Sequence, residues 1–282
     1  MRFLKMQGTG NDFVVLDGLR ERLPVADWAA LARRICDRHF GVGSDGVLVV
    51  EPSERADFRM RMFNPDGSEA EMCGNGIRCF AKYVHDAGLA ERREMAVETG
   101  AGVLDLVVHA RNGTADAVTV SMGVPEFRPD LVPVAVDGEV ARDVPLDGVG
   151  ADVRVTCVSM GNPHAVAFVE RPVAEFPLEQ VGPRVERHRL FPRRVNFEVV
   201  QPRGRGELDV RVWERGAGIT LACGTGACAV AAVARLQRLI GDRVRITLPG
   251  GPLDVEWDGK SDILMTGPAA LVFEGDWPVP EA

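Results

Sequence analysis

The chain has 282 residues, of which 46% are hydrophobic and 26% are charged, and its formal net charge is −8. This is the composition of an ordinary globular protein, and the negative charge argues against nucleic acid or an anionic membrane as a partner. No signal sequence or membrane-length apolar stretch is present, so we expect a cytoplasmic protein with reduced cysteines. The length suits either one large domain or two of ordinary size, and the repeat described below decides for two.

In chain order, the first half reads as strands around two helices. An apolar strand at 13–16 precedes an amphipathic helix at 27–39, for which Asp27 is the expected N-cap and Gly41 the stop. A period-two run at 59–63 ends on an aromatic residue, as a half-buried strand should. The next predicted helix runs from residue 74 to residue 85 and is the dominant one of this half.

The second half begins with a Pro- and Asp-rich stretch, 124–154, which shows no helical pattern and predicts irregular edge strands. Strands are predicted at 165–168 and 209–213, and a dominant helix at 224–239. Almost everything else reads as strand. A last strand at 271–273 is expected to return to the first half of the molecule.

The two halves repeat one another. Cys73 and Cys223 lie 150 positions apart, and each precedes a Gly-x-Gly turn that opens an Ala-rich run of helical spacing. The same offset relates Asn64 to Glu214, each nine residues before its cysteine. A chance match of two short motifs would not extend to the strands before them, so the sequence indicates a duplicated device.

A third pair extends the repeat toward the N-terminus, since Asn11 and Asn162 stand 62 and 61 residues before the cysteine of their own half. We infer two homologous α/β lobes formed by duplication, with a site between them. Their predicted limits are 1–122, joined by a returning 268–282, and 123–267.

Both repeated cysteines are predicted to begin a helix. Unpaired backbone N–H groups and the positive end of the helix dipole favour anions there, so each thiol pKa should fall from about 8.5 to roughly 3.5–7.5. Two such thiols on opposite sides of one carbon could remove a proton from one face and return it on the other. The remaining cysteines are predicted to pack in the interior: Cys36, Cys79, Cys157 and Cys228.

Metal and phosphate sites are poor alternatives for these motifs. The cysteines of each helix are separated by five or four residues, which does not match the close ligand pairs of a zinc site. The Gly-x-Gly turns lack the lysine of a P-loop and the full dinucleotide fingerprint. We therefore expect no metal, and a carboxylate as the anion that the turns hold.

Other polar residues lie near strand ends. His164 alone could equally be structural, but its place in the repeat favours a role in setting which thiol is ionised. Glu214 and Arg215 could form a solvated ion pair, yet the Gly-rich turn after them favours a place in the site. Converging amides would suit a zwitterionic ligand. The candidate amides are Asn11, Asn64, Asn75, Asn162 and Asn196.

Six segments together resemble diaminopimelate epimerases. They are GNDF (10–13), NPDGS (64–68), MCGNGIRCF (72–80), SMGNPH (159–164), ERGAG (214–218) and ACGTGAC (222–228). The resemblance implies an isomerase without cofactor, metal or pyridoxal phosphate. It would interconvert L,L- and meso-diaminopimelate in lysine and peptidoglycan precursor synthesis, as a homodimer. It also implies that each lobe is a mixed, curled β-sheet around a central α-helix, with the active site in the cleft between the lobes.

The same resemblance implies roles for individual residues. Cys73 and Cys223 would be the two bases, and His164 and Glu214 would tune the thiols. The backbone groups that hold the reacting carboxylate would be those of Gly74, Asn75, Gly224 and Thr225. The residues that read the substrate would be Asn11, Asn64, Asn162, Asn196, Glu214 and Arg215. One position departs from the pattern, because Gly46 stands where some members carry a substrate-contacting Gln.

Three alternatives stay open at this point. A proline or hydroxyproline racemase uses the same thiol pair, but typically has His after the first Cys-Gly, where this chain has Asn75, and lacks the ERGAG segment. An amino-acid-binding protein would have no use for two activated thiols. A dithiol redox protein would act on disulfides and exchange no α-hydrogen of an amino acid.

Overall fold

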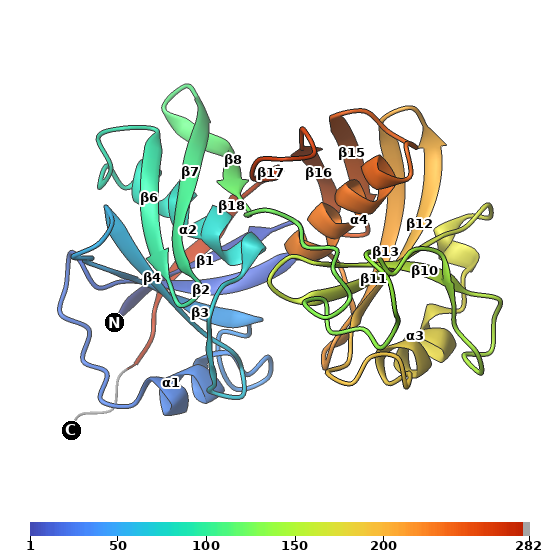
Figure 1. The fold of residues 1–282 in the computed structure, drawn as a ribbon. Helices are drawn as coiled ribbons and strands as arrows, with labels where there is room; N and C mark the ends of the chain where they lie inside the picture. Colours follow the sequence, from blue (N-terminus) through green and yellow to red (C-terminus); the bar gives the residue numbers. More distant parts are fainter. Residues whose placement is uncertain (279–282) are drawn as a thin grey trace. The chain divides into compact units, whose positions relative to one another are not determined.

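The fold is taken from a computed structural model that describes residues 1–278. The chain divides into two compact units (Figure 1). Unit 1 consists of Met1–Val120 and the segment from Thr266 onward, and unit 2 is Ser121–Met265. The lobe limits predicted from the sequence are 122/123 and 267/268. That the two lobes are separate homologous domains with these limits stays a prediction.

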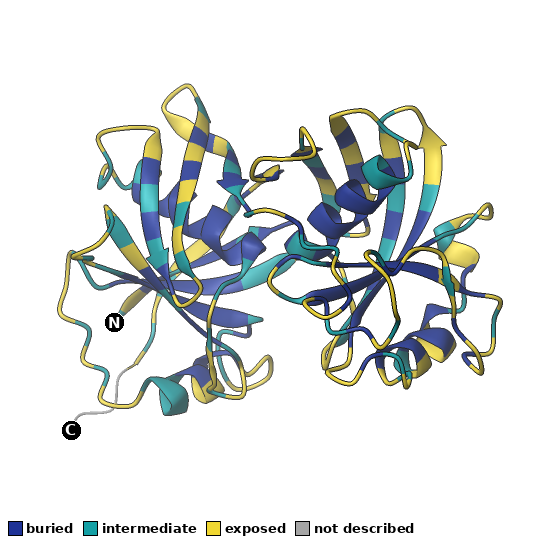
Figure 2. Ribbon diagram, in the orientation of Figure 1, coloured by how far each residue is buried: buried dark blue, intermediate teal, exposed yellow. Residues whose placement is uncertain are grey.

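Unit 1 is a mixed sheet that curls around one helix. Its helices are α1 (Trp28–Ile35) and α2 (Gly74–Asp86). Its strands are β1 (Arg2–Gly8), β2 (Asn11–Asp17), β3 (Gly46–Glu51), β4 (Phe58–Phe63), β5 (Glu69–Ala70), β6 (Glu94–Thr99), β7 (Gly102–Arg111), β8 (Thr114–Ser121) and β18 (Ala270–Asp276). The pair β2–β3 and the pair β4–β6 are parallel, and the other described pairs are antiparallel. Helix α2 contacts β1, β2, β3, β4 and β7, and it is buried along most of its length (Figure 2).

Unit 2 has the same construction. Its helices are η1 (Val173–Glu175), α3 (Leu178–Glu186) and α4 (Gly224–Leu236). Its strands are β9 (Val144–Pro145), β10 (Arg154–Ser159), β11 (Pro163–Phe168), β12 (Asn196–Gly204), β13 (Glu207–Glu214), β14 (Gly218–Thr220), β15 (Arg243–Leu248), β16 (Gly251–Glu256) and β17 (Leu264–Pro268), the last of which leads back to unit 1. Strands β11 and β12, and β13 and β15, run parallel. The buried helix α4 contacts β10, β11, β12, β15 and β16.

Strand registers show the repeat at the level of single residues. In unit 1, Phe13 pairs with Gly46 across a parallel ladder, and Val47 pairs with Phe63 across the next, antiparallel one. The corresponding pairs in unit 2 are His164 with Asn196 and Phe197 with Trp213. The predicted α/β class, with a mixed sheet around a central helix in each half, is confirmed.

Two predicted helices end earlier than expected. Helix α1 does begin after Asp27, whose carboxylate accepts from the N–H of Ala30, but it ends at Ile35 rather than residue 39. The carboxylate of Asp37 accepts from the N–H groups of His39 and Phe40, which makes a turn there. Helix α4 ends at Leu236 rather than residue 239, because Arg238 adopts a positive φ of 61°.

Helix α3 contradicts the prediction that the second half outside its dominant helix is almost entirely strand. It contains Gly182 and Pro183, which disfavour a helix in isolation. Tertiary packing explains both: a Cβ at Gly182 would lie 2.6 Å from a ring atom of Trp213, so only glycine allows this approach. The stretch 124–154 is irregular as predicted, with the two-residue strand β9 in it.

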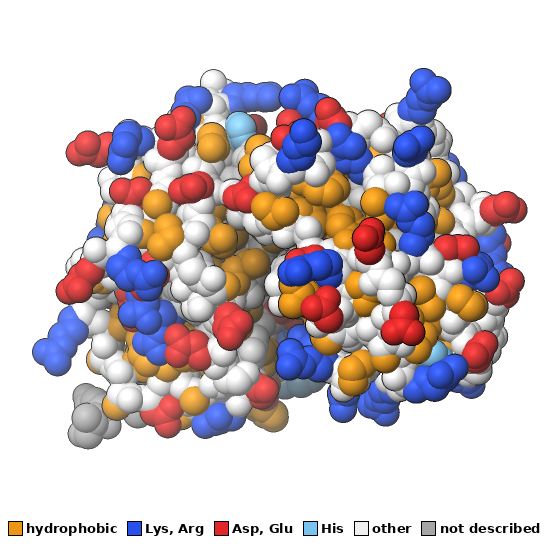
Figure 3. Space-filling model, in the orientation of Figure 1, with side chains coloured by type: hydrophobic (Ala, Val, Ile, Leu, Met, Phe, Trp, Pro, Cys, Tyr) orange, Lys and Arg blue, Asp and Glu red, His pale blue; other side chains and the backbone are white. Residues whose placement is uncertain are grey.

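The surface is mixed in charge, and basic and acidic side chains are interspersed over the face that Figure 3 shows. Within residues 1–278, no helix combines the length and the apolarity that a membrane crossing requires.

Candidate active site

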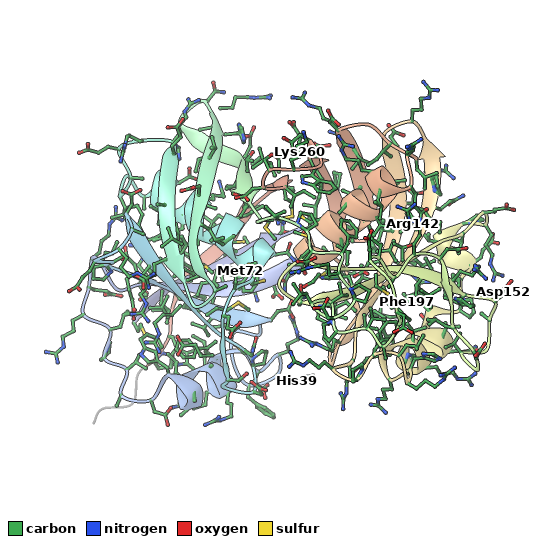
Figure 4. The ribbon with its side chains drawn as sticks, viewed as in Figure 1. His39, Met72, Arg142, Asp152, Phe197 and Lys260 are labelled. Carbon is green, nitrogen blue, oxygen red and sulfur yellow. The ribbon has the colours of Figure 1, made fainter. Side chains whose placement is uncertain are left out.

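Cys73 is the N-cap of α2. Its backbone is extended (φ −144°, ψ 117°), and its Sγ accepts from the N–H of Gly76 at 3.4 Å. A Cβ at Gly76 would lie 3.1 Å from Cδ2 of Leu48 and 3.5 Å from Cζ of Phe13. Glycine therefore lets the start of the helix approach β2 and β3 closely, and this sets the place of the thiol. Figure 4 labels Met72, which directly precedes Cys73.

Two predicted amides lie beside this thiol. The Oδ1 of Asn11 is 3.7 Å from Sγ of Cys73 and accepts from Nδ2 of Asn75 at 3.2 Å. The Nδ2 of Asn11 donates to Oδ2 of Asp45 at 2.7 Å, and the hydroxyl of Thr9 donates to Oδ1 of Asn75. The amide oxygen of Asn11 therefore faces the sulfur, because its NH₂ group is held by a carboxylate.

Asn64 lies at the same sheet edge, since Gly46 begins β3 and Phe63 ends β4. Its Nδ2 donates to the hydroxyl of Ser68 at 2.9 Å. A Cβ at Gly46 would lie 2.9 Å from the carbonyl oxygen of Phe63 and 3.2 Å from Cε of Met62, so no side chain fits there. A side-chain contact of the kind that the resemblance implies for a glutamine is therefore absent from this position.

Arg78 is a structural residue of this unit that the sequence did not reveal. Its side chain is fully buried, and it donates to the carbonyl oxygens of Gly74 and Pro268 and to the hydroxyl of Thr9. These bonds connect the first turn of α2 to Thr9, which directly follows β1, and to Pro268 at the end of β17. The equivalent residue in the repeat is Cys228, so no repeated signal marks this position.

Cys223 is the N-cap of α4, with the same geometry as Cys73. Its Sγ accepts from the N–H of Gly226 at 3.4 Å and lies 3.4 Å from the hydroxyl of Thr225. The expected fall of its pKa is nevertheless wrong. Burial raises the pKa of Cys223 well above its usual value, the carboxylate of Glu214 raises it further, and the bonds from Thr225 and Gly226 offset only part of this.

A chain of contacts connects this thiol to His164. The Nε2 of His164 is 2.9 Å from Oδ1 of Asn162, and Nδ2 of Asn162 donates to the hydroxyl of Thr225 at 3.3 Å. On its other side, Nδ1 of His164 is 2.7 Å from Oε1 of Glu198. Both His164 and Glu198 have fully buried side chains. The structure thus brings together four predicted residues of unit 2.

Three further candidates lie where β12 begins and β13 ends. Asn196 donates from Nδ2 to the carbonyl oxygen of Pro163 and accepts at Oδ1 from the N–H of Arg215 at 2.8 Å. The carboxylate of Glu214 accepts from the hydroxyl of Thr220 at 2.6 Å. The guanidinium of Arg215 is exposed, and it donates to a loop carbonyl oxygen at 3.2 Å. It is therefore accessible to a ligand.

Glu198 was missed by the sequence reading. The run Asn196–Val200 shows no regular alternation of apolar and polar residues and resembles any buried strand. Its pattern therefore did not mark the one acidic residue as a candidate. The available signal was an acid flanked by apolar residues in the buried first part of a strand, because such a group must have a specific partner. Figure 4 labels its strand neighbour, Phe197.

Comparisons with known sequences agree on one family. A sequence model of the family described as diaminopimelate epimerase matches residues 3–128 and 156–272. A diaminopimelate epimerase of Moorella thermoacetica is 51% identical over 280 residues, which is 99% of this chain and 100% of the relative. One from Acetivibrio thermocellus is 50% identical over 277 residues, covering 98% of each chain.

Comparisons with solved structures agree on the fold. A probable proline racemase from Agrobacterium radiobacter K84 superposes with a TM-score of 0.70 at 18% identity, covering 99% of this chain and 93% of the other. A phenazine biosynthesis protein of the PhzF family from Enterococcus faecalis gives 0.71 at 12% identity, covering 99% of both chains. At these identities, the likeness shows a shared fold alone.

Proposed function

Because the chain belongs to the diaminopimelate epimerase family, we propose that Cys73 and Cys223 are the two bases of its reaction. That reaction interconverts L,L- and meso-diaminopimelate by inverting one α-carbon, an isomerisation that belongs to lysine biosynthesis. The observation that carries the proposal is the duplicated geometry. In each unit, one cysteine caps a helix, with its sulfur 3.4 Å from the N–H of the glycine three residues on.

The chemistry follows from where charge develops. Removing the α-proton leaves negative charge that flows into the neighbouring carboxylate, so donors aimed at that group lower the barrier most. The backbone N–H groups at a helix start supply them, each helix being equivalent to about half a positive charge. We assign this role to Gly74, Asn75, Gly224 and Thr225, which begin α2 and α4.

The proton balance requires both sulfurs. One begins as a thiolate and takes the α-proton, and the other begins as a thiol and returns a proton to the opposite face. The enzyme therefore ends with the two protonation states exchanged, ready for the reverse direction. Because burial favours the neutral form of Cys223, we propose that this residue is the donor at the start of one direction.

The remaining polar residues would read the rest of the substrate. Diaminopimelate carries a second amino-acid group at its far end, and amides can donate to its carboxylate and accept from its ammonium. We assign this recognition to Asn11, Asn64, Asn162, Asn196, Glu214 and Arg215. The exposed guanidinium of Arg215 is suited to pair with a carboxylate.

Association with a second copy of the chain is part of the proposal. Strand β18 pairs with β1 and exposes three successive apolar side chains, Leu271, Val272 and Phe273, at 45%, 55% and 46%. Their exposure supports a homodimer. We also propose that the enzyme acts in the cytoplasm, where precursors of lysine and the cell wall are made.

Loss of α-hydrogen in D₂O tests the thiol assignment. We expect the purified chain to incorporate deuterium at the α-carbon of diaminopimelate without added cofactor, and the activity to survive a chelator. Replacing Cys73 or Cys223 with Ala should abolish epimerisation while the fold stays intact. Cys79→Ala, a buried cysteine of α2, is the matched control and should retain turnover. Retention of epimerisation in Cys73→Ala would overturn the assignment.

A further inference from the structure

Side chains of different chemical character lie behind the two repeated thiols. Gly76 and Gly226 occupy equivalent places behind the two cysteines, and a Cβ at each would meet a side chain of β3 in unit 1 or of β12 in unit 2. That side chain is Leu48 in unit 1, at 3.1 Å, and Glu198 in unit 2, at 2.9 Å. Beside them, the apolar Phe13 of unit 1 has the ladder position of His164 in unit 2.

The Glu198 carboxyl has the surroundings of a neutral acid. Its side chain has no exposure, its Oε1 is bonded to Nδ1 of His164, and its Oε2 has no hydrogen-bond partner among the described residues. An ionised oxygen without a donor would be far more costly in this place than a neutral one. Burial correspondingly raises the pKa of Glu198. As an acid, Glu198 donates its proton to Nδ1.

A group that donates to Nδ1 determines which partner is the donor in each hydrogen bond from His164 to Cys223. The neutral imidazole then carries its proton on Nε2, which donates to the Oδ1 of Asn162. The NH₂ group of Asn162 in turn donates to Thr225, whose hydroxyl keeps its own proton for Sγ of Cys223. Without a donor to Nδ1, a flip of the Asn162 amide could reverse the donor and acceptor roles of these hydrogen bonds. Thr225 would then donate away from the sulfur.

Unit 1 has the opposite arrangement. There the carboxylate of Asp45 accepts from the NH₂ group of Asn11, so the amide oxygen faces Cys73. An oxygen acceptor suits a thiol, whereas a hydroxyl donor suits a thiolate. The two units therefore offer their sulfurs opposite hydrogen-bond partners.

We propose that Glu198 is a positioning residue that holds His164 with its proton on Nε2, so that every bond from His164 through Asn162 and Thr225 donates toward Cys223 and supports its thiolate. This support partly offsets the burial of Cys223 and lets a neutral thiol become a base in the other direction of the reaction. The other titratable groups that act on the pair are Glu214 of β13 and Cys157 of β10. They are unchanged in the variants below.

The proposal uses the proposed function only to give the thiolate a purpose, so its tests use no diaminopimelate. The first test is the ¹⁵N NMR spectrum of His164 in the unmodified chain. We expect a protonated Nε2 and an unprotonated, hydrogen-bonded Nδ1 at neutral pH. A proton on Nδ1 with none on Nε2 would overturn the proposal, whatever the variants do.

The second test is the rate at which iodoacetamide alkylates Cys223 as a function of pH, in a Cys73→Ser background. The other four cysteines are each at most 3% exposed. Glu198→Gln keeps a donor toward Nδ1, so its alkylation rate at pH 8 should stay within about twofold of the parent. Glu198→Met removes that donor, and losing one hydrogen bond to the thiolate should lower the rate about tenfold.

Equal losses in the Gln and Met variants, or an unchanged or faster rate in Glu198→Met, would each reject the proposal. A matched control variant separates an effect on the hydrogen bonds to Cys223 from a general loss of protein stability. Val199→Ala, at the next position of β12, removes buried apolar volume from the core without touching the contact chain. It should lower the melting temperature and leave the alkylation profile in place. A profile shifted in Val199→Ala as in Glu198→Met would assign Glu198 a merely structural role.

Discussion

Cys223 experiences two opposing influences on one proton. The start of α4 donates to its sulfur, which favours the thiolate, but burial and the carboxylate of Glu214 favour the thiol more strongly. A motif-based expectation considers only the helix. At this residue, desolvation outweighs the helix N-terminus, and the predicted low pKa is therefore wrong.

Removing the charge of Glu214 should move this balance. Because that carboxylate raises the pKa of Cys223, Glu214→Gln should lower it, and alkylation of Cys223 at pH 8 should become faster. Turnover of diaminopimelate should fall at the same time, because Glu214 is also assigned to the substrate. Slower alkylation in this variant would show that Glu214 does not act on the thiol through its charge.

The repeat in the sequence is what made several candidate site residues recognisable. Both cysteines and the paired positions Asn11 and Asn162 were predicted as site residues because each recurs at nearly the same offset. The structure places Asn11 beside Cys73 and links Asn162 to Cys223 through Thr225. Arg78 and Glu198 were missed because their counterparts are a cysteine and a leucine. Their importance lies in burial and in partners that only the folded chain brings close.

Among the elements, α3 depends most on its packing. Its Gly182 lies against the Trp213 ring, and Trp213 donates to the carboxylate of Glu186 at the end of the same helix. Gly182→Ala should destabilise the chain by about 1–3 kcal/mol, since a buried overlap must be relieved by moving the helix. Urea denaturation measures this. An exposed position of the same helix, Glu179→Ala, is the control and should lose much less.

The element boundaries show where local patterns stop being informative. Asp27 was correctly predicted to cap α1, because an N-cap is a local hydrogen bond that a short sequence can encode. The end of the same helix was misplaced, because the side chain of Asp37 competes for the backbone in a turn. Helix α3 was missed because tertiary contacts outweigh its Gly and Pro.

At the scale of the whole molecule, buried thiols should make stability depend on alkaline pH. Burial raises the pKa of Cys79 and of Cys157 from 9.0 to about 12, so both stay protonated in the fold when the unfolded chain ionises. Their contribution is fully present below pH 9 and is lost as the pH rises toward 12. Each should cost about 1.4 kcal/mol per pH unit in that window.

Denaturant unfolding between pH 7 and 11 measures this loss. We expect a nearly constant unfolding free energy up to about pH 8, followed by a fall that is less steep in Cys157→Ala than in the parent chain. A parallel fall in both proteins would contradict a contribution from Cys157.

Recognition of the far end of the substrate is also a property of the complete molecule. Lysine keeps an α-amino acid centre but lacks the distal carboxylate that Arg215 is assigned to bind. A charged group left without its partner should cost about 1.5–3 kcal/mol, or roughly 10- to 150-fold in kcat/KM. Comparable kcat/KM values for lysine and diaminopimelate would show that the distal end is not read, and epimerisation of proline would favour the racemase alternative.

The pairing of β18 with β1 determines the order in which the two units can finish folding during translation. Unit 2 is continuous in sequence, so it can complete its sheet while the C-terminal segment is still in the ribosome. Unit 1 begins first but must wait for β18, and until then β1 has an open edge. A nascent or truncated chain that ends after unit 2 therefore carries one finished half and one strand with an open edge, the form most exposed to aggregation and proteolysis.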